Sequence, residues 1–122
     1  MRKLLYHIAT TADWNSTQDT YAPQSFEVDG FIHCSTKDQL LAVANAWFRG
    51  RTDLVLLRID ADRVRKAVRY ENLEGGAELY PHLYRRLKKK HVVDAVAFLP
   101  GAKGTFEEAL RAAIEIGPGQ FS

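Results

Sequence analysis

Apolar and polar positions along the chain follow the two periods that distinguish strands from helices. Residues 54–59 form a nearly continuous apolar run, which predicts a central strand covered on both faces. Residues 4–9 and 92–99 predict two further strands, and residues 68–70 predict a short one.

The best helical pattern covers residues 37–49. Thr36 and Gln39 have the spacing of a capping box at its start, and Gly50 stands where a helix end is expected. Apolar residues recur at i, i+3, i+4 and i+7, which predicts one buried stripe. The stripe consists of Leu40, Val43, Ala44 and Trp47.

Capping signals predict two more helices. Thr10 or Thr11 caps a short helix over residues 12–18, and Thr105 with Glu108 opens a helix that ends at about Ile116. Strands and helices alternate without a strict βαβ order. This favours a single α+β domain over residues 1–122, with flanking helices and a sheet that is at least partly antiparallel.

The segment 29–36, Asp-Gly-Phe-Ile-His-Cys-Ser-Thr, combines structural and chemical signals. A loop over residues 21–30 ends in an Asp-Gly turn, and a strand follows over residues 31–34. Alternation along a strand assigns Phe31, His33 and Ser35 to one side and Ile32 and Cys34 to the core side. A His and a Ser at the end of a strand suit a functional site.

The segment 80–84 holds Tyr-Pro-His-Leu-Tyr after a loop at residues 71–79 that contains two glycines. Because proline cannot donate to a strand ladder, Pro81 predicts an edge strand or an ordered loop. The two tyrosines flank His82 and can sandwich a planar ligand, although core packing is expected for at least one of them.

The chain of 122 residues has ordinary globular composition, with 46% hydrophobic and 26% charged residues. A single cysteine excludes an internal disulfide. No apolar stretch approaches the roughly 20 residues of a membrane helix, and the first residues lack the pattern of a signal peptide. A cytoplasmic protein without membrane association is expected.

The net charge of +2 hides an asymmetry. Residues 63–91 hold nine Lys or Arg and only three acidic residues, whereas the rest of the chain is acidic. The run at residues 85–90 suits the phosphates of RNA or of a nucleotide, and a solvated surface is the simpler interpretation.

Three of the four histidines, His7, His33 and His82, lie near strand ends or rigid loops. One such histidine is usually structural, but three favour a shared site. His91 follows the lysine run and is expected to be solvated. Because the chain has no His-x-x-x-His or Cys-x-x-Cys pair, no metal site is predicted.

Glu71, Cys34 and Ser35 are further candidate reactive groups, and their sequence neighbours indicate different roles. Glu71 follows a strand and precedes a flexible loop, so it is a candidate catalytic carboxylate or a salt-bridge partner of Arg69. Cys34 is expected to be buried and unreactive. Ser35 lacks the Gly-x-Ser-x-Gly elbow of a hydrolase nucleophile.

Several stretches carry a family resemblance. They are the segment 29–36, the helix end Trp-Phe-Arg-Gly at 47–50, the strand Asp-Leu-Val-Leu-Leu at 53–57 and Pro-His-Leu-Tyr at 81–84. In this order, within about residues 3–99, the chain resembles the bacterial family catalogued as domain of unknown function 952. That family has been grouped by remote similarity with the ADP-ribosyltransferase superfamily, which implies two small sheets that grip NAD in a cleft.

The resemblance also implies roles for residues. His7 matches the first-strand residue that holds the nicotinamide-side ribose, and Ser35 would shape the nicotinamide pocket. The late-strand glutamate of the superfamily has no match in residues 92–99, so His82 or Glu71 is expected to substitute. The implied catalytic residues are His33, His82 and Glu71, and the implied cofactor-binding residues are His7, Ser35, Thr36, Tyr84 and Arg85.

The resemblance therefore implies an NAD- or nucleotide-binding domain that transfers or cleaves ADP-ribose, with NAD as the substrate. Its basic segment would hold the pyrophosphate or a nucleic-acid acceptor. One alternative is a non-catalytic module that binds a small ligand, or RNA through residues 85–91. Another is a hydrolase that uses the histidines on a phosphorylated substrate.

Overall fold

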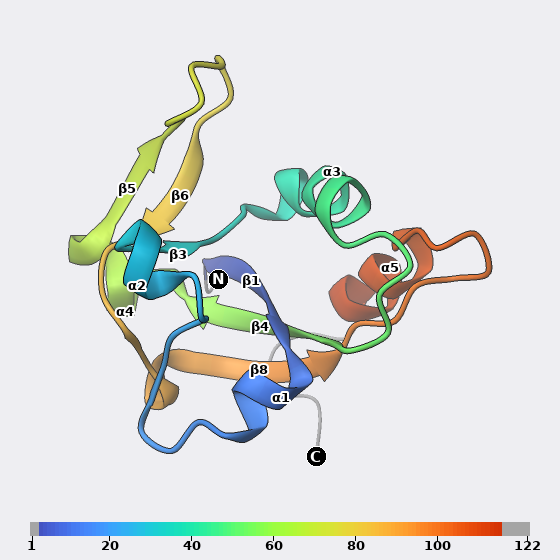
Figure 1. Cartoon of the computed structure of the whole chain (residues 1–122), viewed down its shortest axis with the longest axis horizontal. Coiled ribbons are helices and arrows are strands. Elements are labelled where there is room, and N and C mark those ends of the chain that lie inside the picture. The colour runs from blue at the N-terminus through green and yellow to red at the C-terminus, as the bar shows by residue number, and fades with distance from the viewer. Residues whose placement is uncertain (1–2, 116–122) are drawn as a thin grey trace.

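The apolar run at residues 54–59 is the centre of a three-stranded sheet in the computed structural model, which describes residues 3–115 (Figure 1). β4 (Leu54–Asp60) pairs antiparallel with β1 (Leu4–Thr10) on one side and with β8 (Val92–Ala97) on the other. All residues from 54 to 59 are buried, which confirms the predicted central strand. This first sheet, β1-β4-β8, is the base of an α+β fold with antiparallel sheets.

A second three-stranded sheet has the order β3-β6-β5 and is also antiparallel. Its strands are β3 (Ile32–His33), β5 (Val68–Glu71) and β6 (Tyr80–Leu83). β5 and β6 form the hairpin that projects from the upper left of the molecule in Figure 1. Since β6 is central, the prediction that Pro81 would confine this segment to an edge or a loop is wrong.

Proline is tolerated here because β3 is very short. The Pro81 carbonyl accepts a hydrogen bond from the Cys34 amide at 3.0 Å. Because Pro81 has no N–H, it cannot donate the reciprocal hydrogen bond to Cys34. Regular pairing between β6 and β3 therefore ends at His33. On its other side, β6 pairs with β5 over its whole length.

The segment predicted as a loop over residues 21–30 contains regular structure. β2 (Thr20–Tyr21) pairs antiparallel with β7 (Leu87–Lys88), and α2 (Phe26–Asp29) follows. Gly30 ends α2 with a φ of 79°. The Asp-Gly pair is therefore the end of a short helix, which uses glycine because the left-handed conformation strains other residues.

The predicted helix starts are confirmed for two helices. α1 (Thr11–Asn15) begins after Thr10, whose hydroxyl accepts a hydrogen bond from the Asp13 amide at 3.1 Å. α3 (Lys37–Trp47) begins with the predicted capping box, in which the side chains and backbone amides of Thr36 and Gln39 bond reciprocally.

The remaining helical segments are short. α4 (Ala61–Val64) runs into the 3-10 turn η1 (Arg65–Ala67), and a second such turn, η2 (Lys89–His91), precedes β8. α5 (Glu107–Glu115) follows β8, and its predicted end at Ile116 lies outside the described residues. Within residues 3–115, no helix has the length and apolar character needed to cross a membrane.

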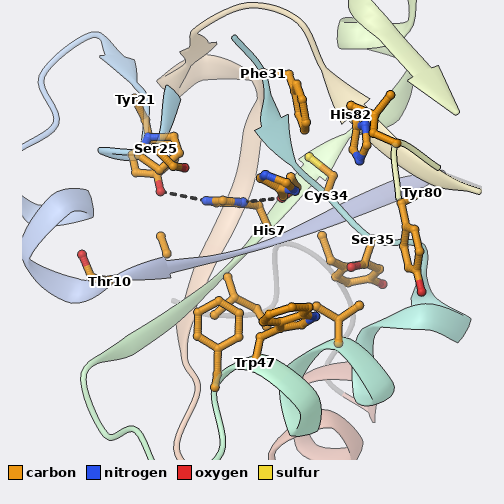
Figure 2. Close-up of a pocket in the computed structure, with 18 of the residues that line it drawn as sticks. His7, Thr10, Tyr21, Ser25, Phe31, Cys34, Ser35, Trp47, Tyr80 and His82 are labelled. Carbon is orange, nitrogen blue, oxygen red and sulfur yellow. Dashed lines mark hydrogen bonds between the residues drawn. The ribbon is translucent and has the colours of Figure 1, made fainter. Parts of the chain in front are cut away.

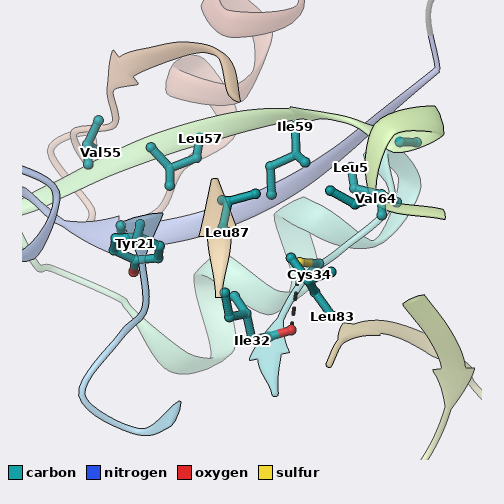
Figure 3. Packing of buried hydrophobic residues seen from close by; sticks show 12 residues of the cluster. Leu5, Tyr21, Ile32, Cys34, Val55, Leu57, Ile59, Val64, Leu83 and Leu87 are labelled. Atoms are coloured by element: carbon teal, nitrogen blue, oxygen red, sulfur yellow. Dashed lines mark hydrogen bonds between the residues drawn. The ribbon is translucent and has the colours of Figure 1, made fainter. Parts of the chain in front are cut away.

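Apolar side chains cover both faces of the first sheet. The cluster in Figure 3 lies between this sheet and the second sheet, and it includes Leu5, Ile32, Leu57, Ile59, Leu83 and Leu87. The cluster on the other face packs against α3 and α5, and it includes Tyr6, Ile8, Leu40, Ala44, Leu56 and Phe106. Odd and even positions of β1 and β4 thus serve different cores, as strand alternation requires.

A buried ion pair joins α5 to the first sheet. The guanidinium of Arg58 on β4 donates to both carboxylate oxygens of Asp94 on β8, at 2.7 Å and 2.9 Å. It also donates to the Ala113 carbonyl of α5 at 2.5 Å. Arg58 is 2% exposed, so these partners replace the water that an arginine normally keeps.

Candidate functional site

A cavity of about 700 Å³ lies beside the edge strand β1 (Figure 2). Its walls are formed by β1, by the segment 31–35, by the facing ends of β5 and β6, and by the C-terminal half of α3. Residues 21–25 close one further side. The cavity therefore brings together parts of the chain that are far apart in sequence.

The two larger sheets are joined at this cavity by one residue pair. The Tyr6 amide donates to the Ser35 carbonyl at 2.9 Å, and the Ser35 amide donates to the Tyr6 carbonyl at 2.8 Å. This bridge fixes the segment after β3 against β1. Ser35 is consequently buried and lines the cavity.

His7 is a buried imidazole contributed by β1. Its Nδ1 lies 2.6 Å from the His33 carbonyl oxygen, which only accepts, so Nδ1 carries the ring proton. Its Nε2 therefore accepts from the Tyr21 hydroxyl at 2.8 Å. Burial lowers the pKa of His7 to about 4 and raises the pKa of Tyr21, so the pair is uncharged near neutral pH.

His82 is held between a carboxylate and an aromatic ring. Its Nδ1 lies 3.0 Å from Glu71 Oε1, and its ring stacks on Phe31 with centroids 4.1 Å apart. Hydrogen bonds from Tyr84 and His82 hold the pKa of Glu71 below its usual range, so Nδ1 donates to an ionised carboxylate. No described residue hydrogen-bonds Nε2 of His82, which can therefore serve a ligand.

Tyr84 supports Glu71 from outside the cavity wall. Its hydroxyl donates to Glu71 Oε1, and this bond raises the pKa of Tyr84. The Arg69 guanidinium lies 5.0 Å from the centroid of the Tyr84 ring. Tyr84 thus fixes the position of the carboxylate that holds His82, and it does not itself line the cavity.

His33 lies next to His82 at the cavity wall. The two ring centroids are 5.4 Å apart, and Phe31 lies 4.7 Å from His33. His33 Nε2 is 3.0 Å from Asp29 Oδ2, and 58% of the His33 side chain is exposed. The structure therefore brings His7, His33 and His82 to one cavity, where His33 is the most accessible of the three.

The other residues of the segment 29–36 have different surroundings. The Thr36 hydroxyl caps α3 and does not line the cavity. Cys34 touches the cavity, but it is 4% exposed and its thiol donates to the Ile32 carbonyl at 3.7 Å. Burial raises the pKa of Cys34 to about 12, which keeps the thiol protonated.

Arg85 lies away from the cavity. Its Nη2 donates to the Arg63 carbonyl and to His91 Nδ1, both at 3.4 Å. His91 is buried, so the expectation that it is solvated is wrong, because the turn η2 directs the residue inward. Burial, with Arg85 as the nearest cation, lowers the pKa of His91.

Two other residues of the basic run contact the region of α1 and α2. Arg86 forms an ion pair with Glu27 at 2.6 Å, and the Lys89 ammonium lies 5.2 Å from the Trp14 ring centroid. No lysine or arginine of residues 3–115 lines the cavity. No metal-binding group of three His, Cys, Asp or Glu side chains is found in that part of the chain either.

Sequence reasoning missed several residues of the cavity wall. The helical spacing predicts that Trp47 is buried in the stripe of α3, but its side chain is 70% exposed and lines the cavity. The sequence places Tyr21 in a loop and Asp13 in the first turn of a helix, and neither position indicates a cavity. No local signal distinguishes these residues, because their role depends on contacts with distant segments.

The comparisons agree with this fold. A family model described as "Protein of unknown function (DUF952)" matches residues 8–95. The crystal structure of protein CC0527 from Caulobacter crescentus is 32% identical with a TM-score of 0.80, over 91% of this chain and 99% of that chain. Its solution NMR structure gives 32% identity and a TM-score of 0.77, over 91% and 97% of the two chains. No curated protein matches.

Proposed function

The chain belongs to the DUF952 family of proteins of unknown function, and on that premise we propose that it binds NAD or a related nucleotide in the cavity beside β1. The main support is the meeting of three imidazoles and the Phe31 ring at one cavity. Such a wall suits a ligand that combines a planar base with ribose hydroxyls. In this proposal the cavity is related to the NAD cleft of the ADP-ribosyltransferase superfamily.

The His7–Tyr21 pair holds a ribose hydroxyl in this proposal. His7 uses its Nδ1 proton for the His33 carbonyl and its Nε2 lone pair for Tyr21. The Tyr21 oxygen still has acceptor capacity, so it is the atom that receives a sugar hydroxyl. Because His7 stays neutral, it orients the ligand and does not transfer a proton.

The Glu71–His82 pair supplies the acid–base group if NAD is cleaved. The bond between ribose C1′ and the nicotinamide nitrogen breaks, and its electron pair leaves with nicotinamide. An acceptor oxygen bonds to C1′ and loses its proton to Nε2 of His82, which Glu71 orients through Nδ1. Glu71 thereby stabilises the imidazolium that forms. His33, beside His82 and more exposed, faces the acceptor.

Thermal unfolding with NAD, ADP-ribose or nicotinamide tests binding. A ligand at 100 times its dissociation constant adds about 2.7 kcal/mol to the free energy of unfolding. Phe31→Leu keeps an apolar side chain but removes the ring that stacks on His82, so it should weaken NAD binding. Tyr70→Leu, an exposed aromatic position outside the cavity, is the control. NAD that stabilises neither wild type nor control would reject the proposal.

Nicotinamide release, measured by chromatography, separates catalysis from binding. His82→Asn should retain NAD binding and lose release, because the amide cannot take the proton from the acceptor. Binding without release in wild type would favour the alternative of a non-catalytic module. His7 favours that alternative. Its ring is neutral and both of its nitrogens are hydrogen-bonded, so its side chain is suited to holding a ligand in place.

The alternative that residues 85–91 bind RNA is tested by measuring RNA binding to the wild-type protein and to variants of this segment. A short RNA should then bind with a steep salt dependence that Lys88→Ala and Lys90→Ala reduce. Both lysines are exposed, so neither substitution should unfold the protein. RNA binding unaffected by these substitutions would exclude this segment as the contact.

A further inference from the structure

The charge on the cavity wall differs from that of a phosphate-binding cleft. Three carboxylates line the cavity, those of Asp13, Glu71 and Glu74, and no lysine or arginine of the described residues does. Glu71 is held by His82 and Tyr84. No cation in the described part of the chain forms an ion pair with Asp13 or Glu74. The wall therefore repels anions and attracts cations.

An aromatic end of the same cavity has no assigned role. Trp47 lines it from the end of α3 and Tyr80 lines it from β6 (Figure 2). Phe48, the residue that follows α3, also lines the cavity. Trp47 is 70% exposed, so most of its side chain is not covered by the protein. The tryptophan face is the strongest aromatic site for a cation, and the carboxylates elsewhere on the cavity wall give the cavity the sign of charge that a cation needs.

The Arg51 guanidinium approaches this end of the cavity, and Asp53 neutralises its charge. The Arg51 guanidinium lies 5.8 Å from the centroid of the Phe48 ring. It also donates to both carboxylate oxygens of Asp53, at 3.0 Å and 2.7 Å. Arg51 does not line the cavity, so the face of Trp47 is left for a ligand.

We propose that the Trp47 end of the cavity binds a planar organic cation, such as the pyridinium ring of oxidised NAD or another N-alkylated heteroaromatic base. The site selects this cation over its neutral and anionic counterparts. This inference rests on the proposed function and names the part of the ligand that the cavity recognises. The phosphates of a nucleotide then lie outside the cavity, away from the three carboxylates that line it.

Three pyridines of nearly equal size test the preference by titration calorimetry. At about pH 8, 1-methylnicotinamide is a cation, nicotinamide is neutral and nicotinate is an anion. A cation–π contact predicts that the cation binds about threefold to thirtyfold more tightly than nicotinamide, and that nicotinate binds most weakly. Oxidised NAD should likewise bind more tightly than reduced NAD, whose ring is uncharged.

Substitutions identify the groups that select the charge. Trp47→Leu keeps an apolar wall and should abolish the advantage of the cation over nicotinamide, whereas Tyr70→Leu should retain it. Asp13→Asn combined with Glu74→Gln should reduce the discrimination against nicotinate. The control for this pair combines Asp19→Asn with Asp38→Asn, at two exposed carboxylates outside the cavity.

The outcomes separate this inference from the proposed function. If oxidised NAD binds but the three pyridines bind equally or not at all, the inference is wrong and the proposed function stands. The same holds if Trp47→Leu leaves the order unchanged. If the pyridines follow the predicted order but NAD does not bind, the cation preference stands and NAD is rejected as the ligand. If no probe binds, both fail.

Discussion

Acidification is expected to destabilise the fold through His7. Burial lowers its pKa in the fold to about 4, whereas a histidine in an unfolded chain titrates near about 6.5. Between these values the unfolded chain binds a proton that the folded chain does not. The free energy of unfolding therefore falls as the pH falls from about 6.5 toward 4, and the contribution is constant above this window.

The magnitude follows from the two pKa values. Their difference corresponds to a limiting loss of about 3.4 kcal/mol. Between about pH 7.5 and pH 5, the same values give a loss of about 2 kcal/mol. That is a large part of the roughly 5–15 kcal/mol that stabilises a typical domain, so denaturant titration will detect it.

Urea unfolding of wild type and His7→Gln at these two pH values is the test. The glutamine amide can donate and accept hydrogen bonds but binds no proton, so the loss on acidification should shrink by about 2 kcal/mol. Phe106→Leu is the control, because it changes an apolar side chain on the other face of the first sheet, alters no titrating group and should lower stability equally at both pH values. Equal losses on acidification in wild type and His7→Gln would refute the reasoning.

Three other predictions concern stability and are measured by urea unfolding at neutral pH. Arg58→Met should cost about 3–5 kcal/mol because it removes the buried guanidinium that bonds both oxygens of the Asp94 carboxylate, and adding Asp94→Leu should recover most of the loss. If the double variant is no more stable than Arg58→Met, the loss of this ion pair is not the cause. Thr36→Ala should cost about 1 kcal/mol through the lost cap of α3; an unchanged midpoint would contradict the role of the capping box. Gly30→Ala should cost about 1 kcal/mol because its φ is 79°, whereas Gly101→Ala, at ordinary φ and with ordinary contacts, should have little effect. Equal costs at the two glycines would show that the conformation of Gly30 is not responsible.

The sequence predicted those features that depend on neighbouring residues. Burial of β4 follows from a run of apolar residues, and the starts of α1 and α3 follow from side chains three residues apart. The family resemblance is confirmed by the match over residues 8–95. Its extension to NAD chemistry stays a prediction that the proposed experiments address.

Features that depend on distant partners were not predictable in this way. Trp47 has helical spacing with Leu40 and Ala44, which are buried, yet its own side chain reaches past the core to the cavity. Tyr21 meets His7 because β2 pairs with β7, a strand far from it in sequence. Pairing across the sheets decides these positions, and a single sequence contains no local record of it.

Pro81 has a consequence for the shape of the molecule. Because its ring nitrogen carries no hydrogen, regular pairing between β6 and β3 ends at His33. The chain after β3 then pairs with β1 through Ser35 and Tyr6. The hollow beside β1 is therefore held open by main-chain chemistry, so its outline should survive many exchanges of the side chains that line it. A cavity with such a main-chain border can change the ligand that it accepts through its side chains while the fold stays the same.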